Sequence, residues 1–245
     1  MTIATESVWV GVDLGTQSVR VIALGDDGVQ LAIASRPVHS RRSAGIHEQD
    51  PDEWWAGVRD ALRDVTAELG PRRRVTALAI SATSGTIVLV DELGHAVSSG
   101  IMYDDARGSG HADRVNEVGH DVWSRLGYRM QGSWALPTLV ELRRRGQLGE
   151  GRMVATQADF VASKLVGRAV PSDSSHALKC GVDLDSLSWP ADVMTGLDIP
   201  LDRLPAVVAS GTVLGTVDSH AAAQTGLHPS CVVVAGMTDG CSAQL

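Results

Sequence analysis

The sequence predicts an α/β fold whose mixed sheet begins as an antiparallel meander of three strands and is flanked by helices. Three observations lead to this prediction: short β-rich runs joined by tight turns near the N-terminus, a sharply capped amphipathic helix after them, and alternating strand-like and helix-like segments beyond. The 245 residues, 44% of them hydrophobic, suffice for a sizeable core in one large or two small domains.

The meander is predicted from residues 8–34. The runs 8–12, 19–24 and 29–34 are apolar and rich in residues that favour strands. A polar turn, Asp13-Leu14-Gly15-Thr16-Gln17-Ser18, joins the first two runs, and Gly25-Asp26-Asp27-Gly28 joins the second to the third. Connections this short join antiparallel strands, so the three runs form a meander.

The helix that follows has clear signals at both ends. Asp50 suits the N-cap, Pro51 the first helical position, and Glu53 completes a pattern like a capping box. Gly70 ends the helix. The apolar residues between these signals recur at helical spacing and predict a buried face: Trp54, Val58, Leu62, Val65 and Leu69.

The rest of the chain alternates between strand and helix patterns. We expect strands at 75–80, 86–90 and 231–235, helices at 106–118, 134–145 and 157–165, a turn at 91–95, a polar break at 171–175, and a loop at 236–240. This order of elements is expected of a ribonuclease-H-like domain, although the pattern alone does not separate that fold from other α/β arrangements. In such a sheet, ligands bind at strand ends, which directs attention to Asp13 and Asp239.

Charge and cysteine content exclude several classes of function. The net charge of −8 argues against a partner such as nucleic acid or an anionic membrane. Cys180, Cys231 and Cys241 show neither a disulfide framework nor zinc-ligand spacing. Residues 1–7 lack a signal-peptide pattern, and no apolar run approaches the roughly 20 residues of a membrane helix. We therefore expect a cytoplasmic protein.

The first turn has the composition of a phosphate site. Gly15 permits close approach of the backbone, while Thr16 and its neighbours offer N–H groups and hydroxyls to phosphate oxygens. Asp13, at the end of a buried strand, is placed to hold Mg²⁺ directly or through water. The alternative is an ordinary hairpin whose Asp13 caps its own turn.

Two further regions carry polar groups suited to chemistry. Asp239 follows a buried strand and could act as a general base. It could also be the N-cap of a helix through 241–245, and both readings can hold at once. The segments Thr83-Ser84-Gly85-Thr86 and Tyr103-Asp104-Asp105-Ala106-Arg107 suit a polyhydroxylated ligand. Their alternative is a pair of solvated loops.

Four segments, taken in order along the chain, resemble the FGGY family of carbohydrate kinases. They are Val10–Arg20, His47–Trp55, Met102–Arg107 and Ala235–Gly240. The resemblance implies a two-domain, actin-like architecture with sugar and ATP sites in the cleft between domains. It also implies that residues 1–245 form the N-terminal sugar- and phosphate-binding domain without the C-terminal adenosine-binding domain, so that this chain alone is inactive.

The resemblance also assigns roles to residues. Asp239 takes a proton from the sugar hydroxyl, and Asp13 organises Mg²⁺. The phosphates of ATP are held around Asp13 by residues of the first turn: Gly15, Thr16, Gln17, Ser18 and Arg20. The sugar is bound by Asp239 and by residues of the two polar segments: Thr83, Ser84, Gly85, Asp104 and Asp105.

The expected substrate is a small-molecule sugar, most simply a ketopentose. Xylulose kinases resemble the chain at Glu48–Pro51 but usually carry Met-His-Gly near Thr83–Gly85, where this chain has no histidine. Ala82–Thr86 and Met237–Asp239 look more like ribulose-kinase-like members, which places D-ribulose before D-xylulose; glycerol and aldonates stay open. Two departures are Tyr103-Asp104 in place of Trp-Asn, and His176, where an acidic or amide residue is common.

Two other classes of function are weighed against a kinase. One is a non-catalytic module that binds sugar or phosphate as a sensor; the presence of both Asp13 and Asp239 favours a kinase over it. The other is an actin-like ATPase acting on protein partners, which the sugar-side segments oppose. Family members often form dimers, so a homodimer is one arrangement that the resemblance allows.

Overall fold

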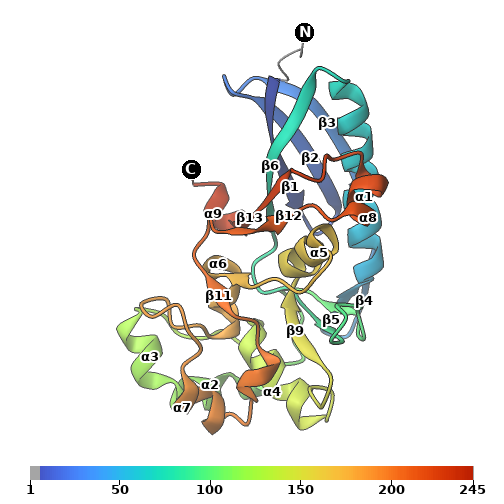
Figure 1. Ribbon diagram of the computed structural model, residues 1–245. Helices are drawn as coiled ribbons and strands as arrows, with labels where there is room; N and C mark the ends of the chain where they lie inside the picture. The colour runs from blue at the N-terminus through green and yellow to red at the C-terminus, as the bar shows by residue number, and fades with distance from the viewer. Residues whose placement is uncertain (1–5, 245) are drawn as a thin grey trace.

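The computed structural model describes residues 6–244, which form two sheets with helices packed around them (Figure 1). The larger sheet has six strands in the order β12-β13-β6-β1-β2-β3, and the smaller has five in the order β4-β5-β8-β7-β9. The strands of the larger sheet are β1 (Glu6–Leu14), β2 (Ser18–Gly25), β3 (Gln30–Pro37), β6 (Arg73–Ala82), β12 (Val213–Thr216) and β13 (Val232–Thr238).

The N-terminal meander is confirmed. β1 pairs antiparallel with β2 and β2 with β3, as the short turns predicted. Alternate residues of β1 are buried, because successive side chains of a strand point to opposite faces of the sheet: Val8, Val10, Val12 and Leu14. The helix α1 (Pro51–Leu69) lies along this face, packed on β2 and β3 (Figure 1).

The signals that delimit α1 are mostly confirmed. The Asp50 side chain accepts a hydrogen bond from the N–H of Asp52, and Gly70 ends the helix with a positive φ of 67°. The predicted apolar face is buried in full. The capping box is wrong, because the Glu53 carboxylate instead accepts from the N–H of His39 at 3.1 Å and so ties the loop after β3 to the helix.

The central strands of the large sheet are parallel. β6 pairs with β1 on one side and with β13 on the other, while β12 closes the edge antiparallel to β13. The loop expected at 236–240 is wrong in part, because β13 runs through Thr238 and the helix α9 (Asp239–Ser242) begins at Asp239; the N-cap is therefore Thr238 and not Asp239. Gly236 permits this strand: a Cβ there would stand 1.9 Å from the Ile80 carbonyl oxygen.

The smaller sheet was not expected as a unit. Only β7 (Ile87–Val90) was predicted; the others are β4 (Ser40–Ser43), β5 (Ile46–Gln49), β8 (Gly100–Ile101) and β9 (Met153–Thr156). A two-stranded ladder joins β10 (Ser172–Asp173) to β11 (Val207–Val208), so the polar break at 171–175 is wrong.

α4 (Ala135–Arg144) and α5 (Gln157–Val166) match the predictions closely. The helix expected at 106–118 is shorter, because Ala106–Gly108 form a turn and a 3₁₀ turn (Ser109–His111) precedes α2. The remaining helices are α2 (Ala112–Val118), α3 (His120–Arg125), α6 (Ser174–Ala177), α7 (Ala191–Gly196) and α8 (Ser219–Thr225), with further 3₁₀ turns η2 (Leu178–Cys180) and η3 (Leu201–Arg203). The helices α2, α3, α4 and α7 lie in the lower part of the molecule in Figure 1, and α5, α6 and α8 lie nearer the large sheet.

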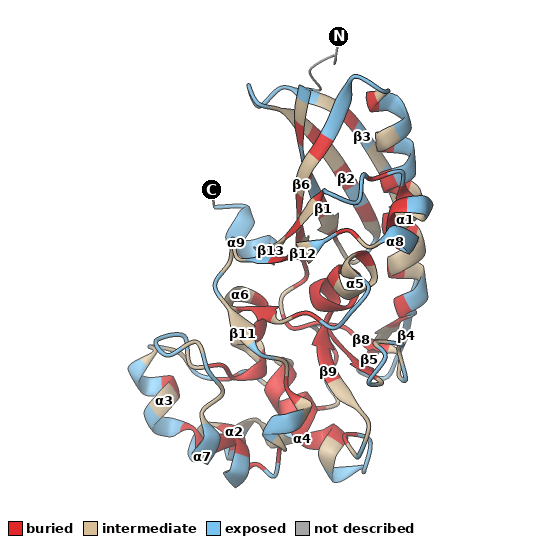
Figure 2. Ribbon diagram, viewed as in Figure 1, coloured by how far each residue is buried: buried red, intermediate tan, exposed pale blue. Residues whose placement is uncertain are grey.

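Two separate clusters of apolar side chains form the core. One lies between the large sheet and α1, α5 and α8, and the other lies among the smaller sheet, α2, α3, α4 and α7 (Figure 2). Cys180 and Cys231 are buried thiols, and burial raises the pKa of each to about 12. No helix among the described residues combines the length and apolarity that crossing a bilayer requires.

Candidate active site

Three parallel strands of the large sheet end at the same edge, and each end carries a predicted site residue. Leu14 of β1 and Thr238 of β13 both lie opposite Ala82 of β6 in the strand register. Asp13 therefore stands beside this edge, and Asp239 follows directly after Thr238. The two carboxylates come from opposite ends of the sequence, yet the charge of Asp239 acts on Asp13.

Asp13 lies in an environment that disfavours a bare negative charge. Burial raises the pKa of its carboxyl, the opposed Arg20 on β2 lowers it, and the nearby Asp239 raises it again, for a net rise. A half-buried carboxylate with a second carboxylate nearby gains from a divalent cation.

The side chains at this strand edge fit a Mg²⁺ ion that is held mostly by substrate phosphates and water. Among residues 6–244, no three His, Cys, Asp or Glu side chains gather into a metal cluster. Mg²⁺ commonly binds through one or two carboxylates plus substrate phosphates and water, so Asp13 suffices as a protein contact. Asp13 thus lies at the strand edge, and its role as a metal ligand stays a prediction.

The phosphate turn predicted at Asp13–Ser18 is shorter in the structure: only Gly15–Gln17 lie between β1 and β2, while Asp13 belongs to β1 and both Ser18 and Arg20 belong to β2. The N–H of Gly15 donates to the Ser18 carbonyl at 3.0 Å, whereas the N–H groups of Thr16 and Gln17 donate to no acceptor within the described part of the chain. Buried Gln49 of β5 donates to the Thr16 carbonyl at 2.7 Å and accepts from the Trp54 indole, also at 2.7 Å. Gln49 therefore fixes the turn through the Thr16 carbonyl, and the N–H groups of Thr16 and Gln17 stay available to an anion.

Lys179 belongs to this site, and sequence reasoning missed it. Its ammonium donates to the Ser84 carbonyl at 2.9 Å and lies 5.7 Å from the centre of the Trp134 ring. Burial lowers the pKa of Lys179, and the charge of Asp239 opposes that effect. Lys179 is one of only two lysines in the sequence, which was the signal available, but nothing in its neighbourhood marked it.

The first predicted sugar segment lies beside Asp239 and Lys179. Thr83 is buried and its hydroxyl bonds internally to Thr86 and to Gln157 of α5, so it shapes the loop. Ser84 is half-buried. Gly85 has a positive φ of 95°, and a Cβ there would come within 2.9 Å of the Lys179 side chain. Glycine at 85 is what lets Lys179 reach across the loop.

The second predicted sugar segment lies at the end of β8 and forms its own network. Asp105 is fully buried and accepts from the N–H of His47 at 2.7 Å and from Arg107, which also binds Glu48 at 2.7 Å. Burial acts to raise the pKa of Asp105, but these hydrogen bonds bring it below its ordinary value. Asp104 is half-buried and pairs with His47 and Arg42.

The two sugar segments leave the same end of the β7–β8 pair, because Ile87 lies opposite Ile101 in the register, yet in the described part of the chain the second segment forms no direct bond to the strand-end residues. Within residues 6–244, no hydrogen bond or ion pair links Asp104 or Asp105 to Asp13, Asp239 or Lys179. The carboxylate of Asp105 is occupied by structural partners, whereas Asp104 borders a surface pocket with Arg42.

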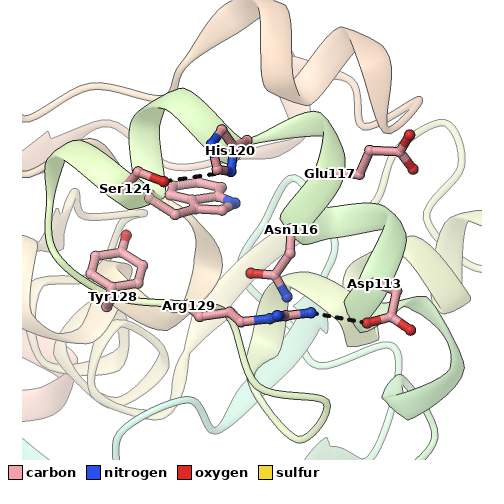
Figure 3. Close-up of a pocket in the computed structure, with 8 residues that line it drawn as sticks. Asp113, Asn116, Glu117, His120, Ser124, Tyr128 and Arg129 are labelled. Carbon is pink, nitrogen blue, oxygen red and sulfur yellow. Dashed lines mark hydrogen bonds and ion pairs between the residues drawn. The ribbon is translucent and has the colours of Figure 1, made fainter.

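A cavity of about 500 Å³ lies elsewhere, on α2 and α3 (Figure 3). The close-up shows Arg129 reaching toward Asp113, an ion pair of 3.2 Å, with Tyr128 and Asn116 on either side. None of the predicted site residues lines this cavity. The carboxylates of Asp13 and Asp239 lie at the strand ends of the large sheet and not in this cavity.

Comparison with known proteins identifies the family of the chain. A model of the N-terminal domain of the FGGY family of carbohydrate kinases matches residues 8–245. The chain belongs to the FGGY family. This FGGY chain is 30% identical over 253 residues to a glycerol kinase from Koribacter versatilis, covering 96% of this chain and 49% of the relative. A xylulose kinase from Klebsiella pneumoniae is 22% identical, over 94% of this chain and 48% of its own.

Solved structures confirm the predicted fold class of this FGGY domain. A xylulose kinase from Rhodospirillum rubrum superposes with a TM-score of 0.89 at 25% identity, covering 97% of this chain and 50% of that one. A gluconate kinase from Lactobacillus acidophilus gives 0.87 at 16% identity, over 96% and 49%, and supports the fold alone. The chain spans about half the length of the curated relatives it matches.

Proposed function

We propose that this chain is the sugar- and phosphate-binding domain of an ATP-dependent kinase that phosphorylates a ketopentose, D-ribulose before D-xylulose. One observation supports the reaction above all: Asp13 and Asp239 lie at the ends of β1 and β13, the two strands that flank β6, near enough for the charge of Asp239 to act on Asp13. Phosphoryl transfer needs a metal-organising carboxylate and a base facing one phosphate-binding turn, and this edge offers all three.

In the proposed reaction, Asp239 is the base. It is solvent-exposed at the start of α9, so a sugar hydroxyl can approach it. As the hydroxyl oxygen forms its bond to the γ-phosphorus, the proton passes to Asp239, and the bond between that phosphorus and the β–γ bridging oxygen breaks to release ADP.

The phosphates would lie against the Gly15–Gln17 turn, where the free N–H groups of Thr16 and Gln17 can donate to phosphate oxygens. Asp13 would hold Mg²⁺, which neutralises charge on the phosphates when bound. Lys179 adds a positive charge near Asp239 and faces the Ser84 loop, which suits it to orient a polyhydroxylated substrate.

The choice of a ketopentose rests on the resemblance of Ala82–Thr86 and Met237–Asp239 to ribulose-kinase-like sequences. Relatives named as xylulose kinases agree with it, while others named as glycerol kinases and gluconokinases require that both alternatives be tested. Adenosine would be bound largely outside these residues, as in a two-domain kinase. We therefore assign this domain the sugar and phosphate sites only.

Isothermal titration tests this proposal. The chain is titrated with D-ribulose, D-xylulose, glycerol and gluconate, each with and without Mg²⁺-ATP. Selective binding of a ketopentose is the expected result. Selective binding of glycerol or gluconate would overturn the substrate class. Binding of a sugar that the full-length gene product never phosphorylates would instead indicate a sugar-binding module.

A further inference from the structure

A buried histidine, His176, lies beside Ala82 at the end of β6, next to the proposed active site. His176, in α6, has a side chain only 1% exposed, and its Nδ1 lies 2.5 Å from the Asp173 carboxylate, itself 3% exposed. Asp173 also accepts from the N–H of His176 at 2.9 Å and is the N-cap of α6. One bond thus fastens the imidazole to Asp173, and the other, from the backbone N–H of His176, caps the helix that carries it. The reaction proposed above gives His176 no role.

The segment that carries His176 contacts the end of β13 and the loop after β6. We call Ser174–Cys180, which comprises α6 and η2, the brace segment. The Ser175 hydroxyl bonds to the Thr238 hydroxyl at 2.9 Å and accepts from the Thr238 N–H at 3.1 Å. Lys179 holds the Ser84 carbonyl. The brace segment therefore fixes the residue before Asp239 and the loop after β6.

We propose that His176 is a positioning residue, whose buried pair with Asp173 holds the brace segment against the ends of β6 and β13 and so sets the places of Asp239 and Lys179. This inference rests on the function proposed above, because that function gives Asp239 and Lys179 their roles. His176 is not required to touch substrate.

The surroundings favour the charged form of the imidazole. Burial acts to lower the pKa of His176, but Asp173 of β10, Asp159 of α5 and the Ala82 carbonyl of β6 raise it above its ordinary value overall. Lys179 is the other charged side chain of the brace segment, and β11 and β13, which also pack on α6, carry no titratable side chain. Among residues 6–244, no group forms a hydrogen bond of normal geometry with the Nε2 atom, so Asp173 is the partner that holds the ring.

The pair consequently predicts a pH dependence with a definite sign. Because the folded-state pKa is raised, the contribution of the ion pair is complete below the unfolded pKa of about 6.5 and is lost as pH rises through the folded value. We expect kcat/KM for the full-length gene product to fall on the alkaline side with the apparent pKa that NMR measures for the His176 ring in the chain.

Two variants and one matched control test the proposal. His176→Asn can still donate a hydrogen bond to Asp173 but cannot titrate, so it should keep partial activity and lose the alkaline limb. His176→Leu should lower kcat/KM about tenfold or more, since small displacements of catalytic groups are costly. His111→Asn changes another histidine that binds a carboxylate, Glu141 at 2.7 Å, far from the strand ends in the fold, and should alter neither property.

A measurement independent of activity separates this inference from the proposed function. Amide hydrogen exchange in the chain should quicken at residues 174–180 in His176→Leu and stay unchanged in β1 and β2. If the wild-type protein phosphorylates no sugar but this exchange pattern appears, the function fails and the brace stands. Unchanged exchange at 174–180, or a His176 ring that titrates no higher than free histidine, overturns the brace.

Discussion

Asp105 and Arg107 form a charged pair at the base of the smaller sheet. Asp105 has no exposed surface, and Arg107 donates to it from Nε at 2.7 Å and from a terminal nitrogen at 2.9 Å. The two-point contact satisfies a carboxylate that water cannot reach. A buried charge is tolerable only while such partners remain.

Arg107→Ala should therefore destabilise the protein strongly. Removing one partner of a buried ion pair costs about 3–5 kcal/mol, because the remaining charge is left uncompensated. Urea unfolding measures the change. Arg41→Ala is the control, since Arg41 is exposed and only 3.8 Å from Glu48, and it should change the unfolding free energy by less than about 1 kcal/mol. Equal effects of the two variants would contradict the prediction.

The same pair predicts acid sensitivity. The folded-state pKa of Asp105 is lowered, so its contribution to stability is complete above its unfolded pKa of about 4 and is lost as pH falls through the folded value. The unfolding free energy should thus drop below about pH 4. Asp105→Asn should make that pH dependence shallower; an unchanged slope would assign the effect to other carboxyl groups.

Asp239→Asn tests the proposed base. The amide keeps the shape of the side chain but cannot accept a proton, so turnover by the full-length gene product should fall by about 10²–10⁴, while the affinity of the chain for sugar changes little. Near-normal turnover would remove Asp239 from the role. Asp26→Asn, in the turn between β2 and β3, is the matched control.

At the scale of elements, the contact between β6 and β13 depends on a glycine, Gly236. The β13 register shifts between Val234 and Met237, and this irregularity brings Gly236 against the backbone of Ile80. The shift also directs the last residues of β13 to the edge where Asp239 begins α9. Close backbone approach and site placement thus have the same cause.

Gly236→Ala should destabilise the fold by about 1–3 kcal/mol, because its Cβ overlaps the Ile80 carbonyl and forces the strands apart. Gly11→Ala in β1 is the control, since a Cβ there meets nothing within 4 Å. Chemical denaturation of both variants gives the comparison. If Gly236→Ala proves as stable as Gly11→Ala, the close approach is not a requirement of the fold.

On the scale of the whole molecule, the two apolar clusters should behave as partly independent units. Leu139 of α4 is fully buried in the lower cluster, and Val21 of β2 is fully buried in the upper one. If one cluster loses a few kcal/mol of stability, that cluster opens locally more often before the whole protein unfolds.

Leu139→Ala should cost about 2–5 kcal/mol and quicken amide exchange first in α2, α4 and α7. Val21→Ala, a smaller truncation in the other cluster, should quicken exchange in β1–β3 instead. Hydrogen exchange read by mass spectrometry distinguishes the two patterns. Uniform acceleration over the whole chain in both variants would show a single cooperative core.

The sequence by itself determined the elements that depend on neighbouring residues. The meander follows from β-rich runs and tight turns, and α1 follows from Asp50, Pro51 and Gly70 around a helical apolar repeat. Asp13 and Asp239 could be proposed because each follows or ends a buried run. Resemblance to FGGY kinases supplied their roles, and the family match bears out that membership.

Only the tertiary structure decided what depends on residues far apart in the chain. The smaller sheet is built from strands of two to four residues, too short for a periodic pattern to reveal. Lys179 lies in a short helical turn without a local signal, and the resemblance marked His176 only as a departure from the family pattern; their contacts with Ser84 and Asp173 appear only in the folded chain. Burial and charge depend on which segments meet, and that information exists only once the chain is folded.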